Sequence, residues 1–176
     1  MNLHSVNEEV FLATDTIVQI RPSDVAFLAA QAQKNARQRA RICAHPDSAD
    51  RLHEMLIVLA RDTYIRPHRH RGKSESFHMI EGELDVVVFH DDGSVREIVR
   101  MGDYRSGRTF FYRLMDDCYH TVLINTPFGF FHETTNGPFN RSDTEFAPWS
   151  PAESDPDAMA YLDHLRSLTS TLNAAA

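Results

Sequence analysis

Three imidazoles and several carboxylates fall close together in the middle of this chain. His68 and His70 are two residues apart, so on a β-strand their side chains would point to the same face. Glu75 follows five residues later, which leaves room for a turn and the start of a second strand. Much later, His120 begins another strand-like run. If these four side chains converge inside a barrel, they form a site for a divalent metal ion: zinc, iron, nickel or manganese.

A metal bound in this way would keep coordination positions free. Four protein ligands around a six-coordinate ion leave two positions for water or substrate, an arrangement typical of sites that react or bind. Cys118 lies two residues before His120 and could add a soft thiolate ligand, but we expect it to be a small buried hydrophobe. His78 faces away from Glu75 by strand parity, so we expect it at the surface.

The elements that must position these residues are mostly β-strands. Between about residues 54 and 135, short runs rich in Val, Ile, Phe and Thr alternate with turn signals. One of these signals, Asp91-Asp92-Gly93, is typical of a hairpin turn. Many short strands separated by turns indicate an all-β sandwich or barrel.

Two helices are expected to flank the barrel. Residues 11–20 are rich in β-branched side chains and predict a strand. An amphipathic helix is expected over 24–40, with Ser23 as its N-cap and with basic side chains at its end. Residues 137–156 predict an extended arm, and 157–172 a last helix. The apolar stripe expected on that helix contains Met159, Leu162, Leu165, Leu168 and Leu172. We therefore divide the chain into residues 1–45, a barrel over 46–140, and a C-terminal arm and helix over 141–176.

Composition and net charge limit which classes of protein this chain can belong to. The chain has 176 residues, of which 42% are hydrophobic, enough for one domain with a sizeable core. Its net charge of −7 makes nucleic acid a poor partner, because the phosphates would repel it. Two cysteines fit free thiols, and we see neither a secretion signal nor the ~18 apolar residues of a membrane span. We expect a cytoplasmic protein, and a homodimer if the N-terminal strand adds to a neighbour's sheet.

A basic cluster stands beside the candidate ligands of this acidic chain. Residues 61–73 carry four arginines and one lysine against a single acid, Asp62. Such a cluster favours a small anionic ligand, for example a phosphate, a carboxylate or a sugar nucleotide. We expect Arg66 and Lys73 to bind this ligand, whereas Arg69 alternates away from the histidines and points outward.

The spacing His68-x-His70-x4-Glu75-x6-Gly82 resembles the first motif of the cupins. In the second motif only His120 is retained, since Met115 to Tyr119 replace its proline and glycine and Asn125 comes one place late. Asp62 stands where the first motif begins with glycine. Over roughly residues 20–150 the chain resembles the WbuC-type cupin metalloproteins of bacteria. The resemblance implies a double-stranded β-helix, or jelly-roll barrel, with a bound metal and with a helix at each end.

Some WbuC-type cupins are associated with the biosynthesis of surface polysaccharide (O-antigen), but no settled reaction comes with the resemblance. As an enzyme, the protein would use its metal to polarise a sugar-like substrate, which suits isomerisation or epimerisation. An iron-dependent dioxygenase is the competing enzymatic route. As a non-catalytic module, it would bind a metal and a small ligand and act in sensing or regulation. The general base stays open, with Tyr64, Tyr112 and Glu133 to be placed.

Overall fold

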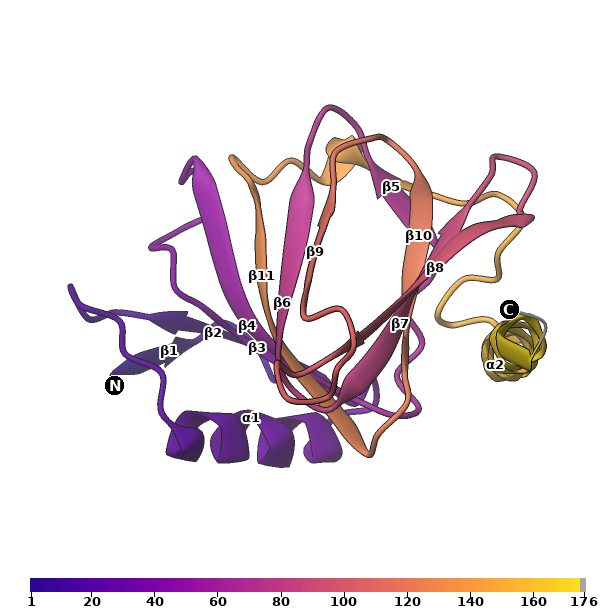
Figure 1. Cartoon of the computed structure of the whole chain (residues 1–176). Coiled ribbons are helices and arrows are strands. Elements are labelled where there is room, and N and C mark those ends of the chain that lie inside the picture. Colours follow the sequence, from indigo (N-terminus) through magenta and orange to yellow (C-terminus); the bar gives the residue numbers. More distant parts are fainter. Residues whose placement is uncertain (175–176) are drawn as a thin grey trace.

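Two β-sheets face each other in this protein, and a helix covers the outside of each (Figure 1). The computed structural model describes residues 1–174, with side chains to residue 172. The seven-stranded sheet contains, in spatial order, β1 (Leu3–Ser5), β2 (Val10–Ala13), β3 (Arg39–Cys43), β4 (Leu52–Ala60), β11 (Phe128–Asn136), β6 (Glu75–Glu81) and β9 (Phe111–Leu114). The five-stranded sheet contains β12 (Thr144–Phe146), β5 (His68–His70), β10 (Tyr119–Ile124), β7 (Glu83–Phe89) and β8 (Val95–Gly102).

The strand pairings nest inside one another. β7 pairs with β8, β6 with β9, β5 with β10 and β4 with β11, all antiparallel. A long hairpin wound into two sheets gives this order, and it is the order of a jelly roll. The chain therefore has the double-stranded β-helix of the cupin fold, as its sequence predicts.

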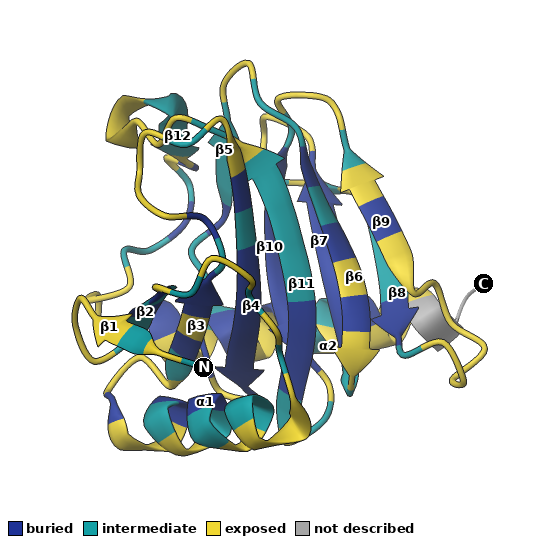
Figure 2. Cartoon of the chain, turned by 90° about the vertical axis from the view of Figure 1, so that its left-hand side faces the viewer, coloured by how far each residue is buried: buried dark blue, intermediate teal, exposed yellow. Residues whose placement is uncertain are grey.

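Apolar side chains form three clusters, one between the sheets and one under each helix. The helix α1 (Pro22–Lys34) packs on the outer face of the seven-stranded sheet, and α2 (Ala158–Ala174) on that of the five-stranded sheet. β4, β7 and β10 are consequently buried on both faces over most of their length (Figure 2). Burial on both faces explains why their sequences are nearly continuous apolar runs.

The N-terminal helix is shorter than the sequence predicts. It ends at Lys34 instead of residue 40, and its N-cap is Arg21 instead of Ser23. The amide of Arg21 donates to the side chain of Asp24 over 2.7 Å, which closes a capping box. Residues 39–43 pair with β4 as β3, because their alternating burial matches the sheet. Of the basic residues expected at the helix end, Lys34 lies in its last turn, whereas Arg37 lies on a loop and Arg39 and Arg41 on β3.

Other boundaries also differ from the expectation. The first strand pattern forms a strand only over 10–13, and the supposed arm contributes β12, which pairs with β5. On α2, Met159 and Leu172 are exposed, so the stripe is narrower than predicted. Its buried positions are Ala158, Leu162, Leu165 and Thr169. Neither helix of the described chain is long and apolar enough to cross a membrane.

Two glycines shape the turns around the barrel. Gly93 closes the β7–β8 hairpin with φ +88, as the Asp-Asp-Gly signal predicts. Gly82 separates β6 from β7 with φ +87, and a Cβ atom there would collide with the backbone carbonyl of Phe128. This tight turn sends the chain from one sheet to the other just after the strand that carries Glu75.

Candidate metal centre

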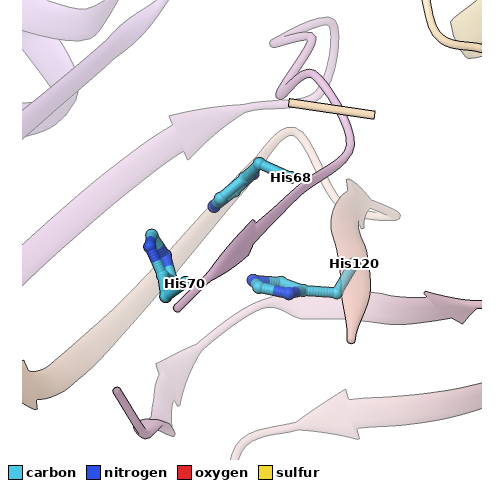
Figure 3. Close-up of side chains that lie close together, drawn as sticks. All are labelled: His68, His70 and His120. Carbon is cyan, nitrogen blue, oxygen red and sulfur yellow. The ribbon is translucent and has the colours of Figure 1, made fainter. Parts of the chain in front are cut away.

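Both sheets contribute side chains to one cluster inside the barrel. β5 presents His68 and His70 to the interior, and its pairing with β10 places His120 directly opposite His68. The ring centroid of His68 lies 4.8 Å from that of His70 and 4.7 Å from that of His120. One nitrogen of each ring lies within 4.8 Å of the others, and Figure 3 shows the rings turned toward one another. The three predicted imidazoles therefore form a group that could bind a metal.

Each ring is oriented through its Nδ1 atom. In His68 and His120 this atom lies 2.9 Å and 3.1 Å, respectively, from the backbone carbonyl two residues earlier. Because a carbonyl oxygen only accepts, both Nδ1 atoms carry the proton and donate it. The Nδ1 of His70 lies 3.3 Å from the hydroxyl of Thr144. A neutral ring with its proton on Nδ1 keeps the lone pair on Nε2, the form in which imidazole binds a metal.

Glu75 comes from the facing sheet and completes the cluster. Its Oε1 lies 2.8 Å from Nε2 of His120, and its Oε2 lies 3.4 Å from Nε2 of His70. Oε1 of Glu75 and Nε2 of His120 are buried and have no hydrogen-bond partner among the described residues. Two acceptor lone pairs thus face each other, which requires either a second proton on His120 or a cation. The donor set fits a divalent cation.

The pKa shifts of His68 and Glu75 suit metal binding, and that of His120 reflects its contact with Glu75. Burial and the neighbouring imidazoles lower the pKa of His68 to about 3. Burial acts to raise the pKa of Glu75, but the facing imidazoles outweigh it and hold that pKa below its usual range. For His120 burial acts downward, yet the Glu75 carboxylate raises its pKa. Glu75 and His68 are thus in the deprotonated forms that bind a metal, whereas the raised pKa of His120 favours a second proton on that ring, which a bound cation would replace.

A cavity of about 890 Å³ opens beside this cluster. Its apolar wall contains Met55, Ile57, Leu59, Phe77, Val122 and Phe131. Glu133 also lines the cavity, from β11. It pairs with Phe77 of β6, and Phe77 is the next inward-facing residue after Glu75 on that strand. Burial and the charge of Glu75 raise the pKa of Glu133 to about 8. The cavity therefore combines an apolar wall with a carboxyl group that holds a proton.

The two predicted ligand-binding cations both line the cavity. Arg66 donates to Ser150 and to the carbonyl of Ala147 over 3.2 Å and 3.1 Å. Lys73 lies 3.0 Å from a carboxylate oxygen of Asp143, so its charge is already matched. Other cations of the predicted basic cluster do not reach the cavity: Arg69 and Arg71 pair with Glu145 on the outside. Arg66 is thus the better placed of the two for an anion.

Several other candidates lie away from the cavity. Cys118 is half-buried, and its Sγ accepts from Arg96 over 3.0 Å. His78 is exposed on the outer face, as strand parity predicts. Tyr64 donates its hydroxyl to the carbonyl of Pro151 over 3.0 Å, outside the cavity lining. Tyr112 is also absent from that lining, which leaves Glu133 as the placed member of the three candidate bases.

The cavity lining also contains side chains that were not assigned to the site from the sequence, two histidines and two arginines among them. His45 and His53 stack face to face with ring centroids 4.0 Å apart. Arg37 and Arg39 stand at the cavity mouth, although the sequence pattern assigned them to the end of a helix. The alternation of Ala40 and Ile42 was the available signal for a strand, and it was masked by helix-favouring neighbours.

Comparisons with known proteins give one family match over part of the chain. A family described as "Domain of unknown function (DUF6016)" matches residues 20–101. No curated protein shows significant sequence similarity to the chain. Among solved structures, the protein TT1209 from Thermus thermophilus is 18% identical, with 68% of this chain and 97% of that one covered and a TM-score of 0.49.

Two further solved structures are more distant. Oxalate decarboxylase from Bacillus subtilis is 17% identical over 56% of this chain and 24% of its own, with a TM-score of 0.45. The cupin domain of Cnp3 from Schizosaccharomyces pombe is 11% identical over 56% of this chain and 64% of its own, with a TM-score of 0.44. This chain spans about a quarter of the oxalate decarboxylase and under two thirds of the Cnp3 domain.

Proposed function

We propose that this chain is a metal-dependent cupin enzyme that acts on a small anionic or sugar-like molecule in its barrel cavity. His68, His70, Glu75 and His120 would hold one divalent cation. The observation that carries the proposal is the contact between Oε1 of Glu75 and Nε2 of His120, both buried and both without a hydrogen-bond partner among the described residues. A cation bound by both atoms would satisfy both at once.

The reaction we favour is an isomerisation or epimerisation. A bound divalent cation supplies Lewis-acid polarisation of a carbonyl or hydroxyl group. Glu133 lines the same cavity with a pKa of about 8, so its protonated form can give a proton to substrate carbon and its ionised form can remove one. Arg66 supplies positive charge at the wall for an anionic group. A role in surface polysaccharide biosynthesis is the finer form of this proposal and is supported by the sequence resemblance to WbuC-type cupins.

Metal analysis tests the first part of the proposal. The full chain is purified without added metal, and bound metal is measured by plasma emission. We expect one ion per chain, and none above background in His68→Ala. His78→Ala is the matched control, because it removes an exposed histidine from the outer face and should keep the metal. A wild-type protein that carries no metal and takes none up when zinc, iron, nickel or manganese is supplied would refute the proposal.

Proton exchange tests the second part. Metal-loaded protein is incubated in D₂O with a panel of sugar phosphates and nucleotide sugars, and carbon-bound deuterium is detected by NMR. We expect exchange in the wild type and a loss of about 10²- to 10⁴-fold in Glu133→Gln, the range for removing a general acid or base. Metal binding without exchange on any member of the panel would instead favour the non-catalytic module.

A further inference from the structure

Two arginines and two glutamates form a closed set of ion pairs at the mouth of the cavity. Arg39 contacts both oxygens of Glu153, with Nη1 at 3.1 Å from one and Nη2 at 3.3 Å from the other. Arg37 approaches the same carboxylate at 2.6 Å. Glu9 lies on the other side, 3.1 Å from Arg37 and 3.2 Å from Arg39. All four residues line the cavity that reaches the histidines.

The contact between Arg39 and Glu153 has the geometry by which arginine recognises a planar oxyanion. Two parallel N–H groups meet two oxygens, the fork arrangement used for carboxylates and phosphates. The Glu153 carboxylate thus sits where the oxyanion of a ligand would sit. Its place in the chain suits exchange, because Glu153 belongs to the irregular segment between β12 and α2, outside any helix or strand.

Charge favours an anion once that carboxylate leaves. With Glu153 in place, the charges of Arg37 and Arg39 are matched by two acids. Without it, the two arginines face Glu9 alone, and the charge of Arg66, which also acts on Glu153, is added from the cavity wall. Burial raises the pKa of Glu153 even though the arginines act to lower it, which shows that the carboxylate loses part of its hydration at this position. A ligand oxyanion with more acceptor atoms would satisfy the same donors better.

We infer that Arg37 and Arg39 form an oxyanion subsite for a phosphate or carboxylate group, and that Glu153 occupies it as an internal substitute until the ligand displaces it. The inference rests on the proposed function insofar as the ligand enters the same cavity as the metal. It adds a second recognition point, distinct from Arg66 and Lys73, and it gives the segment before α2 a part in controlling access.

Removing the charge of the internal substitute tests this assignment. Inorganic phosphate is titrated by calorimetry into the metal-free full chain, and succinate is titrated in parallel to separate the two oxyanion classes. We expect Glu153→Gln to bind one of them at least about tenfold more tightly than the wild type, because the competing carboxylate is gone. Glu8→Gln is the matched control: it removes the same charge from an exposed residue near Glu9 that makes no ion pair within the described chain. It should bind as the wild type does.

The arginines must account for the gain. Arg37→Gln and Arg39→Gln, each placed in the Glu153→Gln background, should return affinity to the wild-type level or below. Circular dichroism checks that each variant is folded, and Arg37, whose side chain is about half exposed, serves if the Arg39 variant is not. No gain in Glu153→Gln, or an equal gain in Glu8→Gln, would overturn the subsite. Metal uptake is measured on separate portions of the same variants after zinc, iron, nickel or manganese is supplied, so a protein that gains phosphate affinity but takes up no metal would refute the proposed function alone.

Discussion

Replacing Glu75 by glutamine separates two interpretations of the buried cluster. The carboxylate is either a metal ligand or simply the partner of a protonated His120, with which it shares a 2.8 Å contact. Glutamine keeps the shape of the side chain and removes its charge. Its amide can also donate to Nε2 of His120, the atom that lacks a hydrogen-bond partner among the described residues.

In the metal-free protein the two interpretations predict different losses of unfolding free energy for Glu75→Gln. If Glu75 and His120 form a structural ion pair, removal of one partner from a site where both are under 5% exposed should cost about 3–5 kcal/mol of unfolding free energy. If the carboxylate is instead a metal ligand, the metal-free wild type already contains an unfavourable contact between two acceptor atoms, Oε1 of Glu75 and Nε2 of His120. The variant then loses little stability, about 1 kcal/mol or less, because a neutral hydrogen bond replaces an unfavourable contact.

If Glu75 is a metal ligand, added metal should stabilise the wild type more than Glu75→Gln. A cation at about a hundred times its Kd stabilises the native state by about 2.7 kcal/mol. For a chain of 176 residues, roughly 2–4 °C per kcal/mol converts this to a Tm rise of about 5–11 °C. We expect the wild type to show this rise, and Glu75→Gln to show less than half of it at the same metal concentration.

The assay is a urea titration with and without metal, with a thermal melt run beside it. His78→Gln is the control, since it changes an exposed side chain of the same strand. A metal-dependent rise of equal size in wild type and Glu75→Gln, together with a loss of about 3 kcal/mol or more in the metal-free variant, would show that Glu75 braces the fold and is no ligand.

Two further outcomes follow from the fold. Gly82→Ala should lower the unfolding free energy by about 1–3 kcal/mol, because φ is +87 and the new Cβ would strike the carbonyl of Phe128; a urea midpoint within error of the wild type would contradict this. Burial and the charge of His53 lower the pKa of His45 from 6.5, so the unfolded chain binds this proton more readily and stability falls as pH drops below 6.5. His68 contributes in the same direction, so the test compares the variant with the wild type. His45→Gln should lose less unfolding free energy than the wild type between pH 7 and 5, and equal losses would refute the prediction.

Much of the fold follows from local patterns. The barrel strands were predictable because turn signals separate short apolar runs, and Gly93 marks one of the hairpins. The end of α1 was not predictable in this way. Residues 35–41 favour a helix by composition, and it is pairing with β4 on one side and β2 on the other that makes 39–43 a strand. β12 is a three-residue strand that exists because β5 offers it an edge, which its own sequence does not reveal.

The site divides in a similar way. Alternation and spacing predicted that His68 and His70 share a face, and the nested pairing then brought His120 beside them. The side of β11 that carries Glu133 could not be assigned, because Phe130 and Phe131 are both buried and face different clusters. The arginines of the cavity mouth were missed for a further reason. Their partner Glu153 lies more than a hundred residues away, and loops set that contact rather than any repeating pattern.

The cluster of ligands works against the stability of the metal-free barrel. His68 is forced to stay neutral, and Glu75 has a buried oxygen without a hydrogen-bond partner among the described residues. Such groups each cost roughly 1–3 kcal/mol. The three apolar clusters supply the stability that offsets this, and two of them lie outside the barrel under the helices. Removal of the metal should therefore leave the fold intact, because the residues that hold the barrel together and those that would hold the cation are different sets.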